Sequence, residues 1–90
     1  MTKRYKFRFF GSVQGVGFRY TARHAANRYR LTGYVKNEYD GSVTCEVQGN
    51  EAEIDAFITT VRNGRYIEIS SMDRTSLPVE EDERSFEVRY

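Results

Sequence analysis

The sequence has few of the residues that build disulfides and metal centres. Its 90 residues include one cysteine, one histidine, one proline and no tryptophan. A single cysteine excludes an internal disulfide, and with a single histidine it leaves no cluster of soft metal ligands. We therefore expect no metal and no cofactor. Cys45 alternates with Val43 and Val47, which favours a small buried hydrophobe over a nucleophile.

The chain also lacks a strong charge and a long apolar run. Its 14 basic and 13 acidic residues leave a net charge of +1, too small a field to indicate a nucleic-acid or membrane partner. No apolar run approaches the length of a membrane span, and the basic N-terminus leads into an alternating pattern rather than a signal-peptide core. We expect one domain over residues 1–90, acting as a cytoplasmic monomer.

Periodicity predicts the first two elements. Tyr5, Phe7 and Phe9 alternate with basic residues, which is typical of a strand with one buried face. From Phe18 to about Tyr29 the apolar residues fall at helical spacing and predict an amphipathic helix. Thr32-Gly33 is expected to end that helix.

A hairpin is expected next. Asp40-Gly41 is a strong hairpin turn signal, and it separates predicted strands over Gly33–Asn37 and Ser42–Gln48. Asp40 is therefore interpreted as a turn residue rather than as a base.

The remaining chain predicts one helix and two strands. A second helix is expected from Asn50 to Gly64, with Asn50 as its cap and Glu53 reaching back in a capping box. A strand should run from Tyr66 to about Arg74. After a solvated acidic loop that includes Glu80–Glu83, a last strand should cover Ser85–Tyr90.

The order of these elements predicts the fold class. It is βαββαβ with an additional C-terminal fifth strand. Two amphipathic helices of this kind bury their apolar stripes on one face of a mostly antiparallel sheet. We therefore expect an α+β protein with a ferredoxin-like α/β sandwich.

The stretch Gly11–Arg19 carries the strongest functional signal. Its three glycines allow a tight turn and close approach of backbone N–H groups to a ligand. A loop that opens a helix also directs the free N–H groups of the first turn at that ligand, and Arg19 adds a planar cation suited to phosphate oxygens. The stretch predicts an anion cradle, although the same residues could form only a turn. Neither the P-loop motif nor the dinucleotide-binding motif fits it.

Asn37 is the second candidate. A carboxamide can both donate and accept, so it can hold a water molecule and direct it at an electrophile. Asn37 would lie close to the cradle if the first and second strands are near neighbours in the sheet. On its own, an asparagine at the end of a strand is more typical of a turn.

Together, the two stretches resemble one family. Gly-x-Val-Gln-Gly-Val-Gly-Phe-Arg, followed by Gly-Tyr-Val-x-Asn-x-x-Asp-Gly-x-Val, is similar to the signature of the acylphosphatases, and the resemblance covers essentially the whole chain. It implies a hydrolase that cleaves small acyl phosphates to a carboxylate and inorganic phosphate. It also implies that Arg19 binds the phosphoryl group and that Asn37 orients the attacking water. The backbone of the loop Gln14, Gly15, Val16, Gly17 and Phe18 would form the cradle.

Three other functions remain open. The aromatic content and the glycine loop also resemble an RNA-binding motif, but that motif belongs on a central strand rather than at a helix start. A phosphate sensor could use the same cradle without needing Asn37. A third possibility is the acylphosphatase-like domain of certain carbamoyltransferases of hydrogenase maturation, which lies in much longer chains with zinc-binding cysteines.

Two further residues have simpler interpretations. His24 lies about 140° around the helix from Arg19 and is expected to be solvated and to face away from the cradle. The carboxylate of Tyr90 could pair with an arginine, and the sequence does not decide whether that arginine is Arg19.

Overall fold

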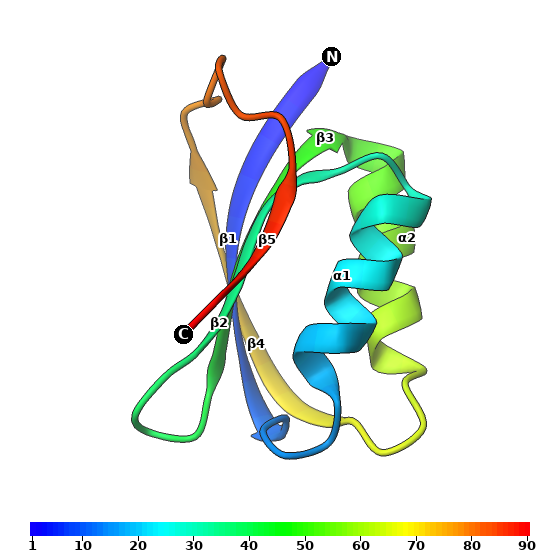
Figure 1. The fold of residues 1–90 in the computed structure, drawn as a ribbon, viewed down its shortest axis with the longest axis vertical. Coiled ribbons are helices and arrows are strands. Elements are labelled where there is room, and N and C mark those ends of the chain that lie inside the picture. The colour runs from blue at the N-terminus through cyan, green and yellow to red at the C-terminus, as the bar shows by residue number, and fades with distance from the viewer.

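Two helices cover one face of a five-stranded sheet (Figure 1). The computed structural model describes residues 1–90, and the predicted ferredoxin-like α/β sandwich is confirmed. The elements in chain order are β1 (Thr2–Ser12), α1 (Phe18–Arg28), β2 (Thr32–Asn37), β3 (Val43–Asn50), α2 (Glu51–Arg62), β4 (Glu68–Leu77) and β5 (Phe86–Arg89).

The sheet order is β4-β1-β3-β2-β5. β1 and β2 are separated by a single strand, β3, which pairs antiparallel with both. Since β1 and β2 are both antiparallel to β3, they run in the same direction and end at the same edge of the sheet. The loop after β1 and the hairpin after β2 therefore share the lower end of the molecule in Figure 1. Only β2 and β5 pair in parallel.

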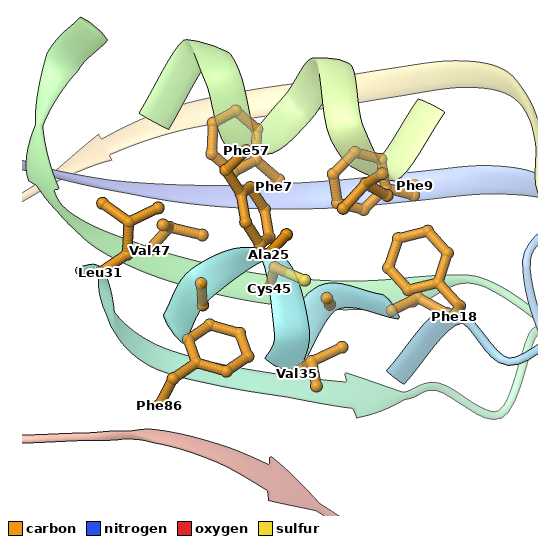
Figure 2. Close-up of a cluster of buried hydrophobic side chains, with 14 of the residues drawn as sticks. Phe7, Phe9, Phe18, Ala25, Leu31, Val35, Cys45, Val47, Phe57 and Phe86 are labelled. Atoms are coloured by element: carbon orange, nitrogen blue, oxygen red, sulfur yellow. The ribbon is translucent and has the colours of Figure 1, made fainter. Parts of the chain in front are cut away.

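The hydrophobic core lies between the helices and the sheet (Figure 2). Strand alternation directs Phe7, Phe9 and Cys45 to the helix face, and all three are fully buried. The buried residues of α1 are Phe18 and the small alanines Ala22, Ala25 and Ala26, and the alanines let the helix pack close to the strands. Burial raises the pKa of the Cys45 thiol, so the prediction of a packed hydrophobe rather than a nucleophile is confirmed.

The helix ends differ in detail from the prediction. α1 stops before Thr32-Gly33, because Arg30 adopts a left-handed backbone with φ 59° and the Leu31 N–H donates to the Ala26 carbonyl at 2.8 Å, as in a Schellman end. Asn50 caps α2 by accepting the Ala52 N–H at 2.9 Å.

The capping box predicted at the start of α2 is wrong. Asn50 is still paired with Thr2 in the β ladder. Glu53 instead lies 3.9 Å from Nε of Arg30.

The acidic loop before β5 is attached to the sheet rather than wholly solvated. Arg4 is only 4% exposed, on the sheet face opposite the helices, and donates to Glu83 Oε1 at 2.8 Å and to Glu46 Oε1 at 2.9 Å. Burial raises the pKa of Glu83, but the hydrogen bonds from Arg4 and Thr32 outweigh it and hold that pKa below its usual value. The expectation of a solvated loop is therefore wrong for Glu83.

This ion pair predicts a pH-dependent contribution to stability. Glu83→Gln should unfold at a lower urea concentration than the wild type at pH 7. The gap should close as the pH falls below about 4, because a depressed carboxyl pKa stabilises the fold only above its unfolded value. The exposed neighbour Glu81→Gln is the control. Equal midpoints for both variants at pH 7 would contradict the assignment.

Candidate active site

The loop between β1 and α1 has the backbone of an anion cradle. Gly15 and Gly17 have φ of 72° and 75°, and a Cβ at either position would meet no atom within 4 Å. The requirement for glycine is therefore one of backbone conformation rather than of space. No side chain caps α1, and no acidic residue lies in its first turn. The free N–H groups and positive end of this helix remain available to an anion.

One pocket of about 330 Å³ opens at this loop. It brings residues of the cradle, the first turns of α1, the end of β2 and the C-terminal strand to one place. Its lining residues are Gly15, Gly17, Phe18, Arg19, Tyr20, Arg23, Asn37, Val88 and Tyr90. The pocket thus unites Arg19 with Asn37, the two side chains that the sequence singled out, even though β3 separates β1 from β2.

Two of the predicted loop residues do not line the pocket. Val16 is half-buried and packs against the hydrophobic core. Gln14 extends its side chain to the β2–β3 hairpin, where its amide donates to the carbonyl of Glu38 at 2.7 Å and to the carbonyl of Ser42 at 2.8 Å. Because Glu38 directly follows Asn37, Gln14 links the cradle to the strand end that carries Asn37. Sequence reasoning considered only the backbone of Gln14 and missed this role.

The hairpin itself is held by Asp40. Its carboxylate accepts the backbone N–H of Ser42 and a guanidinium N–H of Arg8, each at 2.9 Å. The hydrogen bonds from Ser42 keep the pKa of Asp40 below its usual value. The prediction that Asp40 is a turn residue is confirmed.

Arg19 is half-buried in the first turn of α1. Its guanidinium carbon lies 4.8 Å from the centre of the Tyr90 ring, a cation–π distance. The contact is to the ring, and none of the six ion pairs of the structure involves Arg19. From the sequence, only the Tyr90 carboxylate was considered as a partner of Arg19, and no local pattern indicated a contact with the Tyr90 ring.

The surroundings of the pocket are positively charged. No Asp or Glu lines it, whereas the two arginines Arg19 and Arg23 do. His24 is exposed, as predicted, and its ring contacts the Tyr20 ring in a tilted arrangement, with 4.4 Å between centroids. No three His, Cys, Asp or Glu side chains are grouped to hold a metal ion. Neither helix has the length and apolar character of a membrane span.

Comparisons with known proteins agree with this geometry. A family model described as acylphosphatase matches residues 5–88. The acylphosphatase of Clostridium acetobutylicum is 38% identical over 91 residues, covering 100% of both chains. That of Geobacillus kaustophilus is 43% identical over 81 residues, covering 89% of this chain and 86% of the relative.

Solved structures show the same likeness. The crystal structure of the acylphosphatase from Bacillus subtilis matches with a TM-score of 0.90 and 33% identity over 100% of both chains. Full-length HypF in its phosphate- and nucleotide-bound form matches with a TM-score of 0.90 and 28% identity, over 100% of this chain but 12% of HypF. The matched residues, the identities and the shared fold show that this chain belongs to the acylphosphatase family, the hydrolases that act on small acyl phosphates.

Proposed function

We propose that the chain hydrolyses acyl phosphates by direct attack of a water molecule on the phosphorus atom. In this proposal Arg19 and the Gln14–Phe18 backbone hold the phosphoryl group, and Asn37 orients the water. The observation that carries the proposal is the shared pocket. A guanidinium, a glycine-rich helix start and a carboxamide from a distant strand converge on about 330 Å³ with no acidic side chain among them.

The cradle suits a phosphoryl group that carries two negative charges. Phosphoryl transfer has a loose transition state with charge on its three equatorial oxygens, so positioning and electrostatic stabilisation supply most of the catalysis. Backbone N–H groups of the loop and of the first turn of α1 would bind two of those oxygens. Arg19 would bind through its planar donor fork. Its stacking on Tyr90 would restrict the guanidinium to the pocket before substrate arrives.

Asn37 suits a neutral water-orienting role. It is half-buried at the end of β2 and lines the same pocket as Arg19. Its carboxamide oxygen can accept a hydrogen bond from the water while the water's lone pair faces phosphorus. A carboxylate in this position would repel the phosphoryl oxygens, which is a physical reason for an amide here.

The reaction balances without a general acid. The water oxygen forms a bond to phosphorus as the bond from phosphorus to the acyl oxygen breaks. The bonding pair leaves on the carboxylate, whose conjugate acid has a pKa of roughly 4 and needs no protonation at neutral pH. The proton released by the water ends on the phosphate product.

The roles of Arg19 and Asn37 predict a specific pattern of loss. Arg19→Ala and Asn37→Ala should each lower kcat/KM for benzoyl phosphate by about a hundredfold or more, the usual effect of removing one transition-state hydrogen bond. Arg28→Ala, on the same helix but outside the pocket, should keep wild-type activity. EDTA should leave wild-type turnover unchanged. Near-normal turnover by folded Arg19→Ala would contradict its role.

The same assay separates the enzyme from a phosphate sensor. A sensor would bind inorganic phosphate and lose that binding in Arg19→Ala, yet would turn over no benzoyl phosphate in any variant. Calorimetric titration of phosphate with the same proteins distinguishes the two functions.

Gln14 predicts a second, coupled effect. Gln14→Ala removes both hydrogen bonds to the hairpin, so kcat should fall by roughly thirtyfold, at about 1 kcal/mol per lost bond. Phosphate affinity should change little, because the groups proposed to bind phosphate, Arg19 and the loop N–H groups, belong to the loop and α1 rather than to the hairpin that Gln14 holds. In an Asn37→Ala background, Gln14→Ala should lower kcat little further. A double-mutant cycle measures this coupling. Fully additive losses would show that Gln14 does not act through Asn37.

The expectations of a monomer and of a cytoplasmic location stay predictions.

A further inference from the structure

We propose that Arg23 forms a second anion subsite, so that the enzyme favours acyl phosphates whose acyl part itself carries a negative group. The inference rests on the proposed function, because it places the phosphoryl group against Arg19. The chemical class is an acyl phosphate with a carboxylate or phosphate at the far end of its acyl chain.

The helix geometry brings Arg23 to the active site. Arg23 lies four residues after Arg19 on α1, which is one turn and about 6 Å along the axis on the same face. Side chains on a helix lean toward its N-terminus, so Arg23 leans back over the turn that carries Arg19. Both side chains line the one pocket.

The guanidinium of Arg23 has no ion-pair or cation–π partner within the molecule. It takes part in none of the six ion pairs and in no cation–π contact. The other exposed arginines around this helix have partners, since Arg28 stacks on Tyr29 and Arg30 lies near Glu53. Two cations one turn apart repel each other, and a second anionic group on the substrate would relieve that repulsion.

The pocket has room for such a substrate. About 330 Å³ is at the lower end of small-molecule sites, enough for a phosphoryl group with a short acyl chain or one ring. Tyr20 lies on α1 beside Arg19 and Tyr90 lies beneath the Arg19 guanidinium. Their rings offer apolar walls for the acyl part, and the His24 ring contacts that of Tyr20 in a tilted arrangement.

Three substrates that differ only in one carboxylate test the subsite. They are benzoyl phosphate, 3-carboxybenzoyl phosphate and 4-carboxybenzoyl phosphate. Wild type should prefer one of the two carboxy isomers, because a side chain at a fixed place can reach a carboxylate at one position better than at the other. General attraction between a basic surface and an anion would favour both isomers alike.

The variants then assign that preference. Arg23→Gln should lower kcat/KM for the preferred isomer at least tenfold more than for benzoyl phosphate, as expected for a lost charge-assisted hydrogen bond. Arg28→Gln, with its side chain outside the pocket, should keep the wild-type ratio. Equal losses for all three substrates in Arg23→Gln, or an unchanged ratio, would overturn the subsite.

Failure of the underlying function would give a different result. Absence of benzoyl phosphate turnover by the folded wild type would contradict the proposed hydrolysis. The subsite is tested apart from turnover by calorimetric affinities of the corresponding non-hydrolysable benzoylphosphonates. The preferred carboxy isomer should bind at least tenfold tighter than benzoylphosphonate to wild type, and this advantage should be absent in Arg23→Gln. Equal affinities would overturn the subsite.

Discussion

The antiparallel pairing of β3 with both β1 and β2 is the constraint on which the site depends. Because of this pairing, β1 and β2 run in the same direction, and their C-terminal ends lie at the same end of the sheet. The cradle loop and Asn37 meet there, although Arg19 and Asn37 are 18 positions apart in sequence. The Gln14 amide then fastens the two segments together through the carbonyls of Glu38 and Ser42. The order of the strands brings the cradle loop and Asn37 close together, and the Gln14 side chain fixes their relative position.

The fold and the place of the candidate site were predictable because their signals are local. The alternation around Phe7, the alanine stripe of α1 and the turn at Asp40-Gly41 each depend on a few neighbouring residues. The glycines that open α1 likewise follow from the backbone that a strand-to-helix turn requires. The family resemblance added the roles of Arg19 and Asn37, which spacing alone could not assign.

What could not be predicted arises from contacts distant in sequence. Arg4 and Glu83 are 79 positions apart, so nothing near Glu83 distinguishes it from its solvated neighbours. The insertion of β3 between β1 and β2 leaves no trace in the periodicity of any strand. The stacking of Arg19 on Tyr90 depends on β5 pairing beside β2. Each case requires the sheet order before its partner can be named.

The central claim is that water attacks phosphorus rather than the acyl carbon. Hydrolysis of benzoyl phosphate by the wild-type protein in water enriched in oxygen-18 tests it directly, with the products separated and analysed by mass spectrometry. The heavy oxygen should appear in inorganic phosphate, and benzoate should carry none. Heavy oxygen in the benzoate carboxylate would place the attack on the acyl carbon and contradict the roles given to Arg19, Asn37 and the cradle.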